Sequence, residues 1–185
     1  MIQIMTGNIL DADAYVTVIP VNAVGVMGAG LAKQVKIKHP EVCSIYKKWC
    51  REGRLDAGGG VQIDYAANAE DRRIFYLMAT KQHWRSPSQL HWIVEGLQNL
   101  SHAIDEGFPW ATSAHGRTLR RPPRLAAGGT HWTCACSTCT STSSGLLKIA
   151  IPKIGCGHGG LKWSVVKPLI FATLGLKNID VHIYE

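Results

Sequence analysis

Residues 15–38 read YVTVIPVNAVGVMGAGLAKQVKIK, and this stretch decides the fold class. The apolar run over 15–21 is rich in β-branched residues, which is typical of a buried strand. A glycine cluster at 25–30 follows, and 31–38 then has the pattern of a helix that a proline soon ends. A strand, a glycine loop and a helix in this order predict a layered α/β domain.

Strands and helices alternate along most of the remaining chain. Strands are expected at 2–4, 61–65, 74–79, 147–151 and 179–184, and helices at 40–51, 88–106 and 164–174. The helix at 88–106 is the clearest, because Leu90, Ile93, Leu97, Leu100 and Ile104 recur on one of its faces. Ser88 is its expected N-cap.

The composition fits one soluble globular domain. The chain has 185 residues, of which 46% are hydrophobic and 18% charged. No apolar run approaches the roughly 18 residues that a membrane span needs, and residues 1–5 do not resemble the start of a signal peptide. We therefore expect a cytoplasmic protein that has no membrane contact and keeps its six cysteines reduced.

The formal net charge of +7 is unevenly distributed along the sequence. No Asp or Glu occurs between Glu106 and Asp180, whereas nine Lys or Arg do. Such a basic half favours a polyanionic or phosphorylated ligand. On charge alone, a merely solvated basic face explains the pattern equally well.

One segment does not follow the α/β pattern. From Trp110 to Gly145 the chain lacks Ile, Val and every acidic residue, so we expect a single domain over 1–185 interrupted at about 108–146. A disordered insert, a small metal-bound insert and a stretch read in a shifted frame all remain open as explanations. Four residues there could ligate zinc, but their cramped spacing favours no metal: His131, Cys134, Cys136 and Cys139.

Two glycine-rich loops, at 25–30 and 155–160, each follow an apolar strand. Backbone N–H groups at strand ends and helix N-termini attract phosphates, and glycine lets a ligand approach the backbone closely. A single loop of this kind is weak evidence. Two such loops favour a site in which a pyrophosphate binds between them.

Four ordered blocks of sequence carry a resemblance to a known family: GNIL at 7–10, VNAVGVMGAGLA at 21–32, TKQHWRSPS at 80–88 and IPKIGCGHGGLKW at 151–163. Together they resemble the macro domain family, and within it the DarG-like branch of DNA ADP-ribosyl glycohydrolases, which is related to terminal ADP-ribose protein glycohydrolase. The resemblance covers about 1–107 and 147–185.

The resemblance implies a fold and an activity. It implies a three-layer α/β/α domain with a central mixed sheet and an ADP-ribose cleft at the strand ends. In this branch it implies hydrolytic removal of ADP-ribose from a target, by analogy thymidine in single-stranded DNA, with no cofactor. A DNA ADP-ribosyltransferase toxin is the partner implied by the same resemblance.

The resemblance also implies which residues bind ADP-ribose. Asn8, with Ile9, stands where many relatives receive the adenine amino group, although as a turn residue Asn8 needs no ligand to explain it. Asn22 matches a residue beside the scissile bond. The two glycine loops contribute the remaining expected contacts: Gly25, Val26, Met27, Gly28, Ala29 and Gly30, then Gly155, Cys156, Gly157, His158, Gly159 and Gly160.

Lys81 is the expected catalytic group, because it matches the family's functional lysine at a strand end. An amine with a lowered pKa serves as nucleophile or base, and an ammonium stabilises a leaving group. The protein-directed relatives pair this lysine with an aspartate, and Gly159 stands at that position here, which weakens a mechanism based on such a pair. His83 and His158 are candidate acid–base substitutes, although loop histidines usually have no such role.

Trp84 and Arg85 are the expected nucleic-acid contacts, because bases stack on aromatic rings and phosphates attract arginine. Trp92 and Trp163 are expected in the core instead. Two other functions stay open: hydrolysis of protein ADP-ribosyl-glutamate or O-acetyl-ADP-ribose, and non-enzymatic reading of ADP-ribose. Lys81 argues against a pure reader, and Gly159 argues against the first of these rivals.

Overall fold

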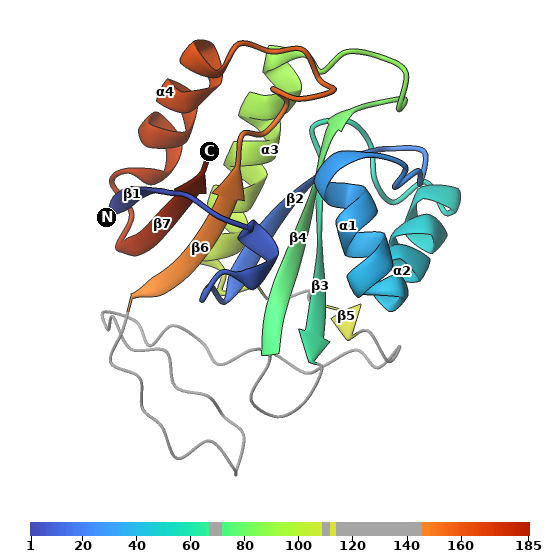
Figure 1. Ribbon diagram of the computed structural model, residues 1–185, viewed down its shortest axis with the longest axis horizontal. Helices are drawn as coiled ribbons and strands as arrows, with labels where there is room; N and C mark the ends of the chain where they lie inside the picture. Colours follow the sequence, from blue (N-terminus) through green and yellow to red (C-terminus); the bar gives the residue numbers. More distant parts are fainter. Residues whose placement is uncertain (67–71, 109–111, 114–145) are drawn as a thin grey trace.

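A seven-stranded sheet between two layers of helices forms the body of the protein (Figure 1). The computed structural model describes residues 1–66, 72–108, 112–113 and 146–185. The strands are β1 (Ile2–Met5), β2 (Val16–Asn22), β3 (Gly60–Ala66), β4 (Arg72–Lys81), β5 (Thr112–Ser113), β6 (Leu147–Pro152) and β7 (Ile179–Tyr184). Their order in the sheet is β1-β7-β6-β2-β4-β3-β5.

The sheet is mixed, as the sequence predicts. β3 runs antiparallel to β4, whereas each of the other neighbouring pairs is parallel. The carboxyl ends of β2, β4 and β6 therefore lie at the same edge, uppermost in Figure 1. Ligands of open α/β sheets bind at this edge.

Two pairs of helices cover the two faces of the sheet. Helices α1 (Gly30–Lys38) and α2 (Pro40–Arg51) pack on one face, and α3 (Leu90–Asp105) and α4 (Trp163–Leu174) pack on the other. A short 3₁₀ turn, η1, spans Ile9–Asp11. The expected helix boundaries are thus confirmed within about two residues.

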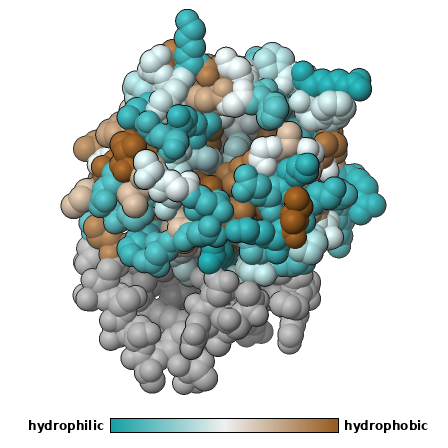
Figure 2. Space-filling view, in the orientation of Figure 1, coloured by the Kyte–Doolittle hydropathy of each residue, from teal (hydrophilic) through white to brown (hydrophobic). Residues whose placement is uncertain are grey.

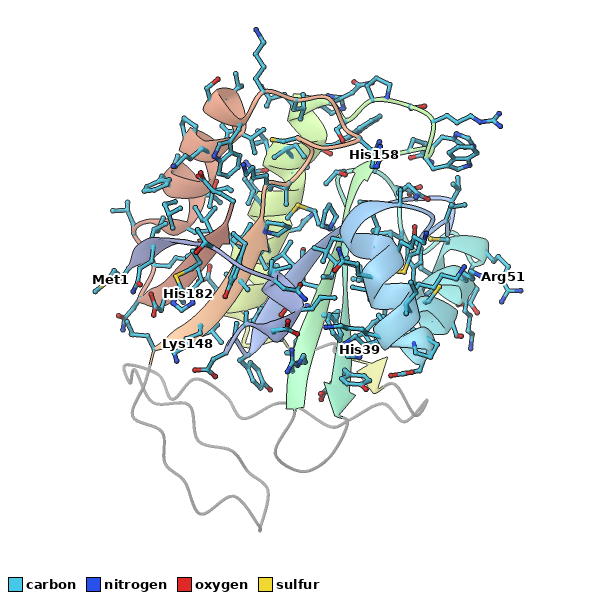
Figure 3. The ribbon with its side chains drawn as sticks, in the orientation of Figure 1. Met1, His39, Arg51, Lys148, His158 and His182 are labelled. Carbon is cyan, nitrogen blue, oxygen red and sulfur yellow. The ribbon has the colours of Figure 1, made fainter. Side chains whose placement is uncertain are left out.

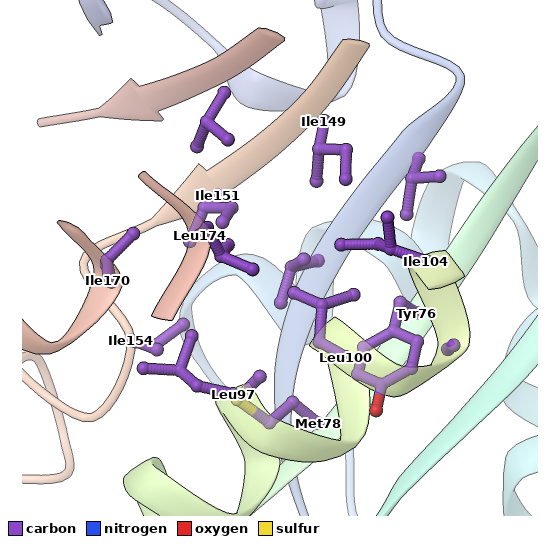
Figure 4. Packing of buried hydrophobic residues seen from close by; sticks show 14 of the residues in the cluster. Tyr76, Met78, Leu97, Leu100, Ile104, Ile149, Ile151, Ile154, Ile170 and Leu174 are labelled. Carbon is purple, nitrogen blue, oxygen red and sulfur yellow. The ribbon is translucent and has the colours of Figure 1, made fainter. Parts of the chain in front are cut away.

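The core beneath α3 and α4 shows why these helices form. Leu97, Leu100 and Ile104 lie at helical spacing and are nearly or fully inaccessible to solvent. They pack against Tyr76 and Ile149 of the sheet, as Figure 4 shows. Burial of a large apolar side chain contributes about 1.5–3 kcal/mol, so this stripe fixes the helix on the sheet.

The start of α3 differs from the prediction. Gln89 is the N-cap, and it makes no side-chain capping hydrogen bond. Ser88 is not the N-cap; its backbone N–H donates to the Gly159 carbonyl at 2.9 Å. Ser88 thus contacts the second glycine loop instead of capping the helix. Leu90, expected on the buried face, is 38% exposed.

Three residues of the expected insert, at about 108–146, belong to the described fold. Phe108 is fully buried in the core beneath α3, and Thr112–Ser113 pairs in parallel with Ile63–Asp64 of β3. His131, Cys134, Cys136 and Cys139, the weighed zinc ligands, lie outside the described residues, as does the rest of the atypical segment.

None of the described helices is long and apolar enough to cross a membrane.

Candidate functional site

A cavity of about 1080 Å³ opens at the carboxyl ends of β2, β4 and β6. Ligand pockets of small-molecule sites reach about 1,000 Å³, so the cavity has room for a dinucleotide-sized ligand. Its lining residues are Pro20, Val21, Asn22, Val26, Gly28, Ala29, Gly30, Leu31, Ala32, Thr80, Lys81, Trp84, Arg85, Pro152, Lys153, Gly155, Cys156, Gly157, His158, Gly159 and Tyr184.

The lining carries positive charge without compensating carboxylates. Lys81, Arg85 and Lys153 contribute to it, whereas no Asp or Glu does among the residues that the structure describes. His158 lies at the same end of the sheet, above α1 in Figure 3. A cavity with this charge favours an anionic ligand.

Asn22 holds the first glycine loop in place. Its Oδ1 accepts the backbone N–H groups of Val24 and Val26 at 3.1 and 3.2 Å, and its Nδ2 donates to the Val26 carbonyl at 2.6 Å. An amide nitrogen has two hydrogens, so one remains for a ligand in the cavity. Asn22 therefore shapes the loop besides lining the cavity.

Tyr46 of α2 is hydrogen-bonded to Asn22. The buried Tyr46 hydroxyl lies 2.6 Å from the Asn22 carbonyl oxygen and 3.1 Å from Asn22 Oδ1, the two acceptors for its proton. Burial raises the pKa of Tyr46 far above its ordinary value, so the hydroxyl remains a proton donor. Sequence reasoning missed this residue, because no local pattern links positions 22 and 46.

The start of α1 is open to an anion. Its N-cap, Ala29, offers no side-chain hydrogen bond, and the first turn contains no acidic residue. The free N–H groups of a helix start and the helix dipole both attract negative charge. Because Gly30, Leu31 and Ala32 line the cavity, this N-terminus can bind a phosphate there.

The second glycine loop contributes more backbone donors. Its ends, Gly155 and Gly160, have φ values of +71° and +77°, a conformation that glycine adopts without strain. Among the described residues, the N–H groups of Gly157, His158 and Gly159 meet no hydrogen-bond acceptor. Consecutive free N–H groups form an anion-binding concavity opposite the start of α1.

Lys81 lies between the two loops. It ends β4 opposite Asn22, after a register shift between Val21 and Asn22 that leaves Thr80 without a partner in β2. Its side chain is buried, and Nζ donates to the His158 carbonyl at 2.8 Å. Desolvation lowers the pKa of Lys81 below its ordinary value, which increases the neutral fraction of the amine.

Gly159 has no room for a side chain. A Cβ atom there would lie 2.2 Å from the Gly155 carbonyl oxygen and 2.3 Å from Ser88 Oγ. The first neighbour is backbone and cannot move aside without a change in the loop. An aspartate at position 159 is therefore incompatible with this loop conformation, so the loop as it stands has no place for the carboxylate of a lysine–aspartate pair.

Trp84 and Arg85 lie at the rim of the cavity. Trp84 is 45% exposed, and the Arg85 guanidinium carbon lies 4.5 Å from its ring centroid. The expected exposure of both side chains is confirmed. Trp92 and Trp163, expected in the core, are instead only half-buried, and the Trp163 indole donates to Glu185 at 2.8 Å.

Most of the expected ADP-ribose contacts line the cavity, but five do not: Asn8, Ile9, Gly25, Met27 and Gly160. Asn8 is exposed and caps η1, with its Oδ1 accepting the Leu10 N–H at 3.1 Å. This is the turn role weighed for it from the sequence, and its adenine contact stays a prediction. His83 also lies outside the lining, so His158 is the histidine better placed for chemistry.

Cys156 lines the cavity as a half-buried thiol, and burial raises its pKa. A raised pKa disfavours the nucleophilic thiolate. No cluster of three metal-ligating side chains occurs in the described part of the chain. Lys153 and Tyr184 are lining residues that the sequence did not single out as contacts.

Comparisons with known proteins connect this site to characterised relatives. No protein-family model matches the chain. The DNA ADP-ribosyl glycohydrolase of Thermus aquaticus is 32% identical over 186 residues, covering 100% of this chain and 41% of that protein. A DNA ADP-ribosyl transferase-DNA ADP-ribosyl glycohydrolase fusion protein of Thermosipho africanus is 26% identical over 99% of this chain and 41% of its own length. The chain thus spans about two fifths of the length of these relatives.

The chain is also similar to solved structures of DarG and DarTG proteins. The macrodomain of Thermus aquaticus DarG superposes with a TM-score of 0.73 and 31% identity, covering 100% of this chain and 98% of that one. Thermosipho africanus DarTG in complex with ADP-ribose superposes with a TM-score of 0.71 and 25% identity, covering 98% of this chain and 41% of that one. Both alignments span nearly the whole of the chain.

Proposed function

Because the chain belongs to the macro domain family, in its DarG-like branch, we propose that it is a glycohydrolase that releases ADP-ribose from modified DNA. The observation that carries the proposal is the buried Lys81 amine in a cationic cavity between two phosphate-binding loops. The lowered pKa of this amine favours its neutral form, which can act as nucleophile or base and which binding of an anion alone does not require.

Different parts of the cavity suit the diphosphate and the distal ribose of ADP-ribose. The start of α1 and the free N–H groups of 157–159 hold the diphosphate from opposite sides. This grip places the distal ribose near Asn22 and Lys81, which face each other across β2 and β4. The glycosidic bond of the distal ribose then lies next to the Lys81 amine, whose lowered pKa increases the fraction that can act as nucleophile or base.

The reaction is hydrolysis of the N-glycosidic bond between the distal ribose and a base, thymine in single-stranded DNA. Water adds across this bond, so that ADP-ribose leaves and the base regains its N–H. The Lys81 amine attacks the anomeric carbon or removes the proton of water. The His158 carbonyl, at 2.8 Å, orients the amine before the substrate arrives.

The rival substrates fit less well. Hydrolysis of ADP-ribosyl-glutamate by a lysine–aspartate pair requires a carboxylate that Gly159 cannot supply, and no other carboxylate lines the cavity among the described residues. O-acetyl-ADP-ribose remains a second candidate substrate only if Lys81 acts alone on esters. The chemistry therefore favours the glycosidic bond.

A partner follows from the same proposal. In the Thermosipho africanus relative, a DNA ADP-ribosyl transferase is part of the same protein. We infer that a transferase of this kind modifies the DNA that this domain restores, which makes the domain antitoxin-like.

The test is release of free ADP-ribose from single-stranded DNA that carries the modification on thymidine. The native chain should release it, and Lys81→Ala should be slower by about 100-fold or more. An ADP-ribosyl-glutamate protein is assayed in parallel. Release from the protein alone would replace the proposal with the esterase, and ADP-ribose binding without any release would replace it with a reader.

A further inference from the structure

One helical hairpin carries a net positive charge. Residues 30–54, which comprise α1, α2 and the turn after them, contain seven Lys or Arg and two Glu. The other described residues contain nine basic and nine acidic residues, so their formal charges cancel. Of the basic window expected from the sequence, 107–179, the structure describes 107–108, 112–113 and 146–179, where five Lys occur without any Asp or Glu.

Four cations of this hairpin make no ion pair or hydrogen bond within the described structure: Lys33, Lys36, Lys47 and Arg51. All four are exposed. We call them the hairpin cations. Elsewhere, by contrast, Lys148, Lys167 and Lys177 are neutralised by Asp13, Glu185 and Asp105.

The hairpin borders the cavity through the start of α1, although none of the hairpin cations is itself a lining residue. Lys33 follows the lining residues Gly30, Leu31 and Ala32 on the first turn of α1. The Lys47 backbone packs under the first glycine loop, 3.5 Å from where a Cβ of Gly25 would lie, and Arg51 follows one turn later. Arg51 projects from the outer flank of α2 in Figure 3, and Figure 2 shows mainly hydrophilic surface over this side.

The same rim carries Trp84 and Arg85. The segment that bears them is tied to the turn after α2, because Gln82 Oε1 accepts the Ala57 N–H at 3.2 Å. An exposed aromatic ring with an arginine stacked on it thus lies on a segment that is hydrogen-bonded to the chain following α2. Stacking surface beside a row of positive charge suits a single-stranded nucleic acid.

We propose that the DNA strand leaves the cavity over α2 and along the α1–α2 hairpin, with Lys47 and Arg51 binding the phosphates nearest the modified nucleotide. This inference rests on the proposed function, because it names the path of that substrate. Lys33 and Lys36 continue the path on α1. Near α4, two described cations are unpaired, Lys153 and Lys162, against the four of the hairpin, because Lys167 is paired with Glu185.

The experiment compares the native chain with Lys47→Gln/Arg51→Gln and with a matched control, Lys162→Gln/Lys167→Gln, which removes two charges at the other rim. Three measurements are made: hydrolysis of an ADP-ribosylated single-stranded 20-mer, hydrolysis of ADP-ribosyl-thymidine without flanking nucleotides, and binding of the unmodified 20-mer. All are repeated over a range of salt concentrations.

The hairpin variant should lose roughly tenfold in kcat/KM on the 20-mer at low salt and keep its rate on ADP-ribosyl-thymidine. The slope of log affinity against log salt for the unmodified strand should fall by roughly 1.4, which corresponds to two phosphate contacts. The control variant should change little in any of the three measurements.

Equal losses in both variants would overturn the path, because net charge alone would then explain them. A loss on ADP-ribosyl-thymidine would overturn it as well, since the hairpin variant would have damaged the cavity. If the native chain cleaves neither substrate, the proposed function fails, but binding of the unmodified strand still decides the path independently.

Discussion

At the scale of single residues, Lys81 lies in an environment that disfavours its charged form. Its amine is buried, and no described carboxylate in the cavity stabilises its charged form. The pKa is lowered as a result. An amine in this position is poised to act in its neutral form.

We therefore expect activity to rise with pH until the lowered pKa of Lys81 is passed, below the ordinary value of 10.5. Lys81→Arg keeps the positive charge but cannot deprotonate, so it should be nearly as inactive as Lys81→Ala. The measurement is the pH profile of kcat on modified DNA for the three proteins. Substantial activity of the arginine variant, with a flat profile, would assign Lys81 a purely electrostatic role.

Tyr46 is a positioning residue, since it touches Asn22 rather than the cavity. Tyr46→Phe removes the hydroxyl that donates to the Asn22 carbonyl, whereas Asn22 Oδ1 keeps the N–H groups of Val24 and Val26, so the loss of stability should be about 0.5–1.5 kcal/mol. It should also weaken ADP-ribose binding several-fold, because the first glycine loop loses its support. Calorimetry with ADP-ribose and thermal unfolding measure the two effects.

Tyr76→Phe is the matched control for Tyr46→Phe. Tyr76 is equally buried, lies beneath α3, and makes no hydrogen bond through its hydroxyl in the described structure. Its removal should leave the affinity for ADP-ribose unchanged. If both variants weaken binding alike, the effect comes from core packing and not from the support of Asn22.

At the scale of elements, the second glycine loop is held at three points. Lys81 binds the His158 carbonyl, Ser88 binds the Gly159 carbonyl, and Leu161 donates to the Gly155 carbonyl. The strand β4, the start of α3 and the loop itself thus fix its shape together. These contacts orient the free N–H groups of residues 157–159.

Gly159→Ala tests this arrangement. The added methyl would meet the Gly155 carbonyl at 2.2 Å, so we expect a loss of about 1–3 kcal/mol in the free energy of unfolding and weaker ADP-ribose binding. Gly157→Ala is the matched control, because nothing lies within 4 Å of its Cβ position. Denaturant unfolding of both variants gives the comparison. A Gly159→Ala protein as stable as the control would show that the loop adapts at little cost.

At the scale of the whole molecule, the ligand site joins both helical layers. The start of α1 lies on one face of the sheet, and the second glycine loop leads into α4 on the other. A ligand that binds both loops links elements far apart in the chain. It binds only the folded protein, so it must stabilise the whole domain.

ADP-ribose at 100 times its Kd should add about 2.7 kcal/mol and raise Tm by roughly 5–10 °C for a chain of this size. Adenosine lacks the diphosphate and should raise Tm much less at the same concentration. Differential scanning calorimetry makes the comparison. Equal shifts for the two ligands would mean that the loops do not grip the diphosphate.

The sequence by itself determined the elements and the choice of loops. Period-two and period-3.6 patterns depend on neighbours a few residues apart, so strands, helices and the two glycine loops were predictable. The resemblance of the blocks around Asn22, Lys81 and Gly155–Gly160 to macro domains likewise pointed to one site.

Only the tertiary structure decided which groups meet there. The support of Asn22 by Tyr46, the contact of Ser88 with Gly159 and the exclusion of a side chain at position 159 join residues that are distant in the sequence. Which lysines form ion pairs was hidden for the same reason, because Lys148, Lys167 and Lys177 meet carboxylates that are distant in the sequence. Local patterns record what each segment prefers, whereas packing determines which neighbours it receives.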